Sequence, residues 1–132
     1  WKYLSNKSMM AFHNQLGEEG EKIAIQYLKS KGYIIHHKNW RMSHLEIDII
    51  AEHNDELIFV EVKTRSSDRY GEPEEAVGYK KEKDLIRLAD VYLEQLYLEV
   101  SARFDIIAII LNDSEFRITH FEDAFSPMTF KM

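Results

Sequence analysis

The stretch of residues 45–65, LEIDIIAEHNDELIFVEVKTR, decides the fold that this chain can adopt. Two short apolar runs rich in Ile and Val, Leu45–Ala51 and Leu57–Val62, lie on either side of the polar segment Glu52–Glu56. Isoleucine and valine favour strands, and a short polar connection between two such runs favours an antiparallel pair. The sequence therefore predicts a β-hairpin here, around which the other elements must be arranged.

The register of the predicted hairpin follows from its tip. If Asn54 and Asp55 form the turn, the pairing that continues from there brings Asp48 directly opposite Glu61. Side chains opposite each other on one face of an antiparallel pair have Cβ atoms about 4.5–5.5 Å apart, and like charges placed there destabilise the sheet. Alternation along the strand puts Lys63 on the same face as Glu61. A pairing that opposes stability indicates that these three side chains serve a function.

A divalent cation between the two carboxylates would turn their repulsion into coordination. Carboxylate oxygens suit Mg²⁺ or Mn²⁺, and Mg²⁺ keeps several waters that can take part in chemistry. We predict that Asp48 and Glu61 bind this ion and that the backbone carbonyl of Val62 is a further ligand. On the opposite face of the hairpin, alternation predicts an apolar layer formed by Ile47, Ile49, Val60 and Val62.

The rest of the chain supplies helices and strands on both sides of the hairpin. Apolar residues at helical spacing predict one helix before it and one after it, and further apolar runs predict three more strands. A loop of about a dozen residues, Thr64–Glu75, is expected between the hairpin and the second helix. The predicted helices are Phe12–Lys31, which Gly32 ends, and Ala76–Leu98; the predicted strands are Tyr33–Trp40, Phe104–Leu111 and Phe116–Phe121.

The order of these elements, α-β-β-β-α-β-β, predicts the class of fold. A helix-linked crossing from the third strand to the fourth calls for a mixed sheet with helices packed on it. We therefore expect a three-layer α/β domain. Residues 1–9 are interpreted as an N-terminal extension and residues 10–132 as one domain, because a chain of 132 residues can bury one hydrophobic core but not two.

Composition limits the classes of function. The chain has 17 Lys and Arg against 23 Asp and Glu, which excludes a protein that coats nucleic acid with its whole surface, so any such contact must be local. The absence of Cys excludes disulfides and a thiolate zinc site. Neither a membrane-spanning apolar run nor a signal peptide is evident. We expect a cytoplasmic protein without a membrane partner.

The residues of the hairpin resemble those of a known group of nucleases. Asp48 followed by Glu61-Val62-Lys63 resembles the PD-(D/E)XK signature of the restriction-endonuclease-like nucleases, whose α-β-β-β-α-β core is similar to the predicted order. Over about residues 10–126, the chain resembles the small bacterial YraN family more closely. The residues that carry this resemblance are Gly17, Gly20-Glu21, Ala24, Tyr27-Leu28, Asn39-Trp40-Arg41, Glu46 to Ile50, Phe59 to Arg65, Tyr70-Gly71, Ala76-Val77 and Arg103-Phe104-Asp105.

The resemblance implies a restriction-endonuclease-like fold and a Mg²⁺- or Mn²⁺-dependent endonuclease that hydrolyses phosphodiester bonds. DNA is the favoured nucleic acid, including branched or processing intermediates. The implied catalytic residues are Asp48, Glu61 and Lys63, with Glu21 as the acid of the first helix, although a solvated helix face explains Glu21 equally well. Ile47 stands where the signature has its proline.

Basic residues gather after Lys63 in the sequence. Lys63 itself would hold or help deprotonate the attacking water, or stabilise charge that develops on the phosphate. We predict nucleic-acid contacts at Arg65, Lys80 and Lys81, because phosphate contacts give affinity without reading base sequence. The resemblance places a basic residue of the second helix on Lys81, with Lys80 as the alternative. A solvated helix face explains this run equally well.

Other functions remain open at this point. A non-catalytic nucleic-acid-binding module could keep the fold, although it has no need of paired acids, and a partner domain would bind neither nucleic acid nor metal. A homodimer and the choice between DNA and RNA are open too. Arg103 and Asp105 share one face of a strand and are expected to form a structural pair. A metal site at His36 and His37 is not expected, because adjacent strand residues point to opposite faces.

Overall fold

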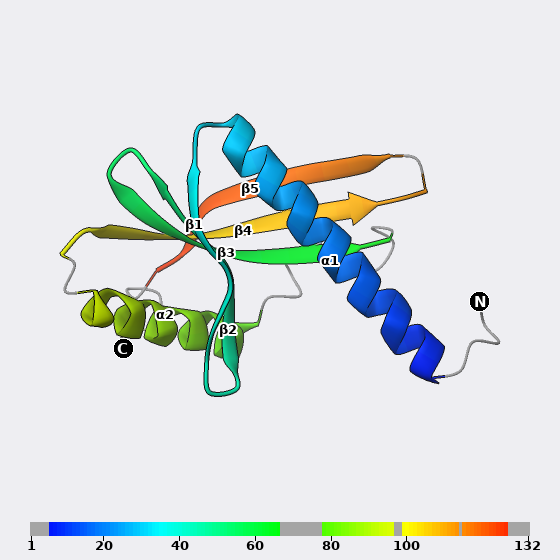
Figure 1. The fold of residues 1–132 in the computed structure, drawn as a ribbon, viewed down its shortest axis with the longest axis horizontal. Helices are drawn as coiled ribbons and strands as arrows, with labels where there is room; N and C mark the ends of the chain where they lie inside the picture. The colour runs from blue at the N-terminus through cyan, green and yellow to red at the C-terminus, as the bar shows by residue number, and fades with distance from the viewer. Residues whose placement is uncertain (1–5, 67–77, 97–98, 114, 127–132) are drawn as a thin grey trace.

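The computed structural model describes residues 6–66, 78–96, 99–113 and 115–126 of the chain. In chain order its elements are α1 (Asn6–Ser30), β1 (Ile34–Met42), β2 (Leu45–His53), β3 (Glu56–Arg65), α2 (Tyr79–Gln95), β4 (Ser101–Leu111) and β5 (Phe116–Phe125). The strands of this described part form one sheet in the order β1-β2-β3-β4-β5, with α1 and α2 packed on its two faces (Figure 1). The predicted three-layer α/β fold with an α-β-β-β-α-β core, the restriction-endonuclease-like arrangement, is confirmed.

The hairpin of β2 and β3 has the register that its sequence predicts. Asn54 and Asp55 have φ values of 50° and 64°, the left-handed pair of a type I′ turn, whose twist matches that of the strands it joins. From this turn the antiparallel pairing continues to Ile49 opposite Val60. β3 pairs in parallel with β4, because α2 carries the chain back along the sheet between them. The sheet is therefore mixed, as expected.

Several element boundaries differ from the predicted ones. α1 begins at Asn6 rather than Phe12, and β3 continues through Thr64 and Arg65, which the prediction placed in a loop. The strand continues because these two residues pair with the long apolar strand β4. β2, β4 and β5 also extend further than predicted, and β1 begins one residue later and ends two residues later than predicted. Ser66 lies outside the strand, as predicted for the loop, and the rest of the predicted loop, residues 67–75, lies outside the described residues. The second helix spans Tyr79–Gln95 rather than Ala76–Leu98, because Gly78 has an extended backbone before it. Residues 76–77 and 97–98 of the prediction lie outside the described residues.

Two apolar clusters cover the two faces of the sheet. On the α1 side, Ala24 and Leu28 pack against Ile49, Val60 and Val62, as predicted for these three strand residues. On the other side, α2 packs against β2, β3 and β4, and its buried residues are Leu85, Leu88, Ala89 and Tyr92. Neither α1 nor α2 combines the length and apolar composition that a membrane-spanning helix needs.

β2 contributes to both clusters, and the alternation of its side chains is interrupted between Ile47 and Ile49. Ile49 packs on the α1 side, whereas Ile47 packs on the α2 side, which corrects the prediction that placed both in one apolar layer. β1 is distorted opposite this point, where Asn39 has a left-handed φ of 54°. Such distortions increase the local twist of a strand pair. Asp48 therefore lies between Ile47, which packs on the α2 side, and Ile49, which packs on the α1 side.

α1 approaches β3 closely at Gly20. A Cβ atom at this position would overlap Oγ1 of Thr64 and lie 2.8 Å from its Cβ, closer than real atoms come. Only a residue without a side chain permits this approach. The approach brings the next helical residue, Glu21, close to Asp48 on β2.

We expect Gly20→Ala to destabilise the protein by about 1–3 kcal/mol, the usual penalty of an overpacked contact. Gly17→Ala is the matched control, because a Cβ at Gly17 on the same helix has no neighbour within 4 Å. There the better helix propensity of alanine should stabilise the protein by about 0.5–1 kcal/mol. Urea unfolding measures both variants. Equal effects of the two substitutions would contradict the close packing of α1 on β3.

Candidate functional site

The two acids of the hairpin lie where the pairing of β2 with β3 ends. The last pair of that ladder is Ile49 with Val60, and beyond it Oδ2 of Asp48 accepts a hydrogen bond of 2.8 Å from the N–H of Val62. Asp48 and Glu61 are only 8% and 7% exposed, and their carboxyl groups interact directly. The structure thus brings these two acids together through their side chains, one step beyond the backbone ladder.

Glu61 has a buried oxygen atom that the described residues leave without a hydrogen bond. This atom is Oε2, and Nζ of Lys81 on α2 lies 3.9 Å from it, within ion-pair range but beyond hydrogen-bond distance. A buried polar atom without a partner costs about 1–3 kcal/mol, and more when it is charged. The atom is therefore available to a cation.

Burial raises the pKa of both hairpin acids. The pKa of Glu61 rises to about 8, first because burial disfavours the charged form and then because the Asp48 carboxylate lies beside it, while the charges of Lys81 and Lys63 oppose the rise. Burial also raises the pKa of Asp48, against the hydrogen bonds from Val62 and Glu61. The pair therefore retains a proton near neutral pH when no cation is bound.

Two further acids approach Asp48. Carboxylate oxygens of Glu21 on α1, Glu46 on β2 and Asp48 lie within 4.8 Å of one another. Burial and the Asp48 carboxylate raise the pKa of Glu21 to about 7, and a hydrogen bond from Asn39 opposes this rise. Glu46 also accepts a 2.7 Å hydrogen bond from Nε of Arg41. The structure brings Glu21 close to Asp48, and its catalytic role stays a prediction. Sequence reasoning missed Glu46, although alternation puts Glu46 on the same side of its strand as Asp48.

The predicted basic residues differ in how they lie toward the acids. Lys81 is the lysine of α2 that approaches Glu61, whereas the Lys80 side chain is 88% exposed and pairs with an acid one turn along the helix. The geometry thus separates the two lysines that the sequence left as alternatives. Lys63 is half-buried and its charge acts on Glu61, and Arg65 is half-buried at the end of β3.

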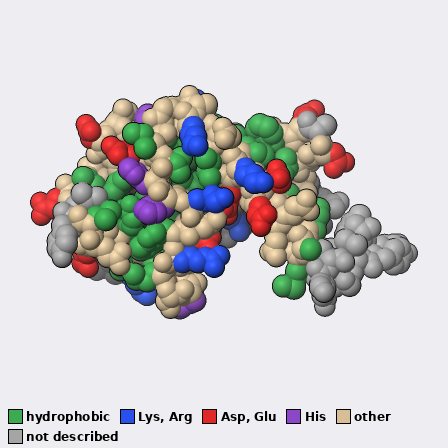
Figure 2. Space-filling model, viewed as in Figure 1, with side chains coloured by type: hydrophobic (Ala, Val, Ile, Leu, Met, Phe, Trp, Pro, Cys, Tyr) green, Lys and Arg blue, Asp and Glu red, His purple; other side chains and the backbone are tan. Residues whose placement is uncertain are grey.

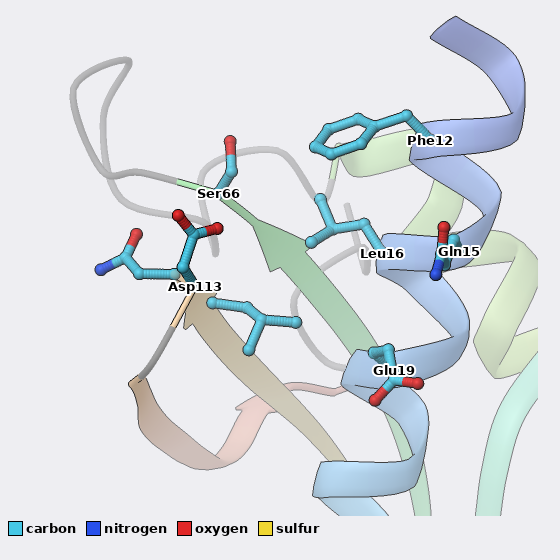
Figure 3. A pocket seen from close by; sticks show the side chains of 8 residues that line it. Phe12, Gln15, Leu16, Glu19, Ser66 and Asp113 are labelled. Carbon is cyan, nitrogen blue, oxygen red and sulfur yellow. The ribbon is translucent and has the colours of Figure 1, made fainter. Parts of the chain in front are cut away.

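The cavity shown in Figure 3 is separate from these acids. It measures about 390 Å³ and lies between the first half of α1 and the ends of β3 and β4, with Phe12 and Leu16 on the helix side and Ser66 and Asp113 on the strand side. None of the predicted catalytic residues lines it. Basic and acidic side chains lie side by side on the face that α1 crosses, without one continuous basic surface in that view (Figure 2). The charges of the acids, rather than a deep cavity, therefore define the candidate site.

Two other features that the sequence analysis considered lie away from the four acids of the candidate site. Arg103 and Asp105 form the expected pair, with hydrogen bonds of 2.9 and 2.8 Å. His36 lies 2.8 Å from Glu52, and neither His36 nor His37 belongs to a group of described residues that could hold a metal ion.

Comparison with known sequences assigns this chain to a protein family. The model of UPF0102, described as an uncharacterised protein family, matches residues 20–109. The chain belongs to the UPF0102 family. This confirms the resemblance to the YraN family, which is the same family. A UPF0102 protein of Bacteroides thetaiotaomicron is 48% identical over 121 residues, covering 92% of this chain and 100% of the relative. One of Thermodesulfovibrio yellowstonii is 49% identical over 111 residues, covering 84% and 96%.

In the absence of metal, we expect the free energy of unfolding of this UPF0102 protein to decrease as the pH rises from about 5 to about 8. The pKa of Glu61 is about 8 in the folded chain against 4.5 for the free side chain. Its contribution to stability is therefore fully present below the lower pKa and lost as the pH rises through the upper one. Glu61→Gln should flatten this decrease, whereas Glu94→Gln, at an exposed position of α2, should preserve it. Thermal unfolding in EDTA measures the effect, and identical pH profiles of wild type and Glu61→Gln would contradict the buried, protonated pair.

Proposed function

We propose that this UPF0102 protein is a nuclease that uses Mg²⁺ or Mn²⁺ to hydrolyse phosphodiester bonds in nucleic acid, with DNA as its substrate. The observation that carries the proposal is the buried Asp48 and Glu61 pair, in which Oε2 of Glu61 has no hydrogen-bond partner among the described residues. Buried acids without compensating donors destabilise a fold. A pure binding module has no use for them, whereas a bound cation would remove the penalty.

The residues present fit such a cation. Asp48 and Glu61 offer carboxylate oxygens, the ligands that Mg²⁺ and Mn²⁺ prefer, and the carbonyl of Val62 is the proposed backbone ligand. Glu21 and Glu46 place further carboxylate oxygens within 4.8 Å of those of Asp48. The cation, when bound, would supply positive charge and Lewis acidity to the phosphate. The retained proton of the acid pair would be released on binding, since carboxylates coordinate in their ionised form.

Lys63 is the proposed residue for proton transfer or charge stabilisation. It follows Glu61 by two positions on β3, and its positive charge already acts on the Glu61 carboxylate. From this place its amino group can hold the attacking water, take its proton when neutral, or stabilise the charge that develops on the phosphate.

Nucleic acid is proposed to bind beside the acids through local positive charges. Arg65 continues β3 beyond Lys63, Lys81 approaches Glu61 from α2, and Lys80 adds an exposed charge at the start of that helix. Because the chain has a net charge of −6, long-range attraction to a polyanion is weak, and binding must depend on such short-range contacts.

Mg²⁺ or Mn²⁺ should raise the melting temperature of the wild type, because the cation binds only the folded arrangement. Asp48→Asn combined with Glu61→Gln should abolish this shift. Asp90→Asn combined with Glu94→Gln is the matched control, since it neutralises two exposed acids of α2. Thermal unfolding with and without metal measures the shift. If both double variants respond to metal as the wild type does, the cation binds elsewhere.

Lys63→Ala should reduce cleavage by more than about a hundredfold while the metal-induced shift in melting temperature persists, because Lys63 is not a proposed ligand. Lys29→Ala, exposed near the end of α1, should cleave as the wild type does. The assay compares linear, branched and single-stranded DNA with and without metal. Full activity of Lys63→Ala would remove this residue from the mechanism, and salt-sensitive DNA binding by the wild type without any cleavage would favour the non-catalytic binding module.

A further inference from the structure

A second group of aromatic and polar side chains surrounds a cavity further along α1. The cavity measures about 250 Å³ and is lined by Tyr27, Lys31, Tyr33, His53, His120 and Glu122. This volume lies below the roughly 300–1,000 Å³ of sites that hold drug-sized ligands. The cavity therefore suits a ligand portion of about one flat ring.

A fully buried carboxylate, that of Asp105, fixes the walls of this cavity. It accepts hydrogen bonds from Arg103 and lies 2.7 Å from Nε2 of His120. Burial alone would raise the pKa of Asp105, but hydrogen bonds from His120, Arg103 and the N–H of Asp123 hold it below its ordinary value. Because an ionised carboxylate can only accept, Nε2 of His120 carries a proton. The other ring nitrogen, Nδ1, lies 3.0 Å from the hydroxyl of Tyr27.

The same group satisfies its own charges. Ligand atoms of Asp105, His120 and Glu122 lie within 4.8 Å of one another, as metal ligands would. Nη2 of Arg103, however, lies 2.8 Å from Oδ2 of Asp105 and 3.2 Å from Oε1 of Glu122. A guanidinium at these distances supplies the positive charge between the two acids. The group therefore positions the cavity walls without a cation.

Aromatic rings form part of the cavity wall. The rings of Tyr33 and His53 stack with centroids 4.1 Å apart and planes 4° apart. Tyr33 is buried and His53 is half-buried, so His53 is the more accessible ring of the stack. Nζ of Lys31 lies 5.7 Å from the centroid of the Tyr27 ring, which adds a positive charge at the cavity. The cavity of Figure 3, by contrast, has Phe12 as its one aromatic residue among the described lining residues.

We propose that this second cavity binds one unpaired nucleotide of the substrate strand, with its base stacked on His53 and its phosphate near Lys31. Proteins hold bases outside a duplex by stacking them on aromatic side chains, and a base inside a duplex exposes neither of its faces. Glu122, whose side chain is 59% exposed, offers a hydrogen-bond acceptor to the edge of the base. The inference rests on the proposed nuclease function and specifies its substrate class as strands with an unpaired nucleotide near the cleaved bond.

The spacing along the chain sets the place of this nucleotide. Tyr27 follows Glu21 by six positions, about 9 Å along a helix. His53 follows Asp48 by five positions, about 16 Å along a strand. Because a stacked strand advances about 3.4 Å along its axis per nucleotide, the unpaired nucleotide is expected about three to five positions from the cleaved phosphate.

Abasic scanning of a short, fluorescently labelled oligothymidylate tests this inference. In EDTA, which prevents metal-dependent cleavage, removal of the base at one position should weaken binding to the wild type by about fivefold or more. His53→Ala should lose the same factor on the intact strand and no longer respond to the missing base. His36→Ala is the matched control, because His36 lies in a different cavity beside Tyr92 and should bind as the wild type does. Lys31→Ala should make the salt dependence of binding shallower.

Four outcomes would overturn the inference. A scan without any sensitive position, or a His53→Ala variant with wild-type affinity and pattern, removes the cavity from nucleic-acid binding. Free thymidine monophosphate that binds as tightly as the oligonucleotide would show that the ligand is a nucleotide and not a strand. Failure of every oligonucleotide to bind would overturn the inference as well. In each case the metal-dependent cleavage assay decides separately whether the proposed nuclease function stands.

Discussion

The hydrogen bond from the N–H of Val62 to Oδ2 of Asp48 is the contact on which the candidate site depends. It lies where the backbone ladder of β2 and β3 ends, and it gives a carboxylate a donor inside the sheet. Once Asp48 is held there, Glu61 lies beside a like charge, and the negative charge of Asp48 contributes to the raised pKa values of Glu61 and Glu21. Burial is the first cause of these raised pKa values, and the Asp48 carboxylate that this backbone donor holds in place is the second.

How far the sequence predicts this site depends on whether each feature is local. The register is local, because Asn54 and Asp55 form a turn whose geometry selects the pairing. The change of face at Ile47 is not a local feature, because it accompanies a left-handed residue in the neighbouring strand β1. The grouping of Glu46 with Glu21 is not local either, because it depends on where α1 crosses the sheet. The direction in which Lys81 points depends on the residue at which α2 begins. The sequence before α2 has no periodic pattern from which that first residue could be predicted.

The apolar layers explain how the fold tolerates several buried acids. Each fully buried Ile, Val or Phe contributes about 1.5–3 kcal/mol, and strands β2, β3 and β4 carry an almost continuous series of them on both faces. A buried charge that is left without a partner costs about 3–5 kcal/mol. A few such residues on two covered faces therefore offset one uncompensated acid, so the sheet can hold the Asp48 and Glu61 pair without losing its fold. The apolar residues of α1 and α2, which cover the two faces of the sheet, thus stabilise the fold that holds the acids.

α1 connects the two places at which the proposed function would act on nucleic acid. Gly20 lets the helix approach β3, Glu21 then meets Asp48, and Tyr27 lines the second cavity. For a protein with a net charge of −6, screening and net repulsion make long-range attraction to a polyanion ineffective. Short-range contacts of the basic residues, coordination at the acids and stacking in the cavity would have to supply the affinity. Stacking acts only on bases that have left the duplex. An acidic nuclease of this design would consequently discriminate by the presence of unpaired nucleotides, because a fully paired duplex offers it phosphate charge alone.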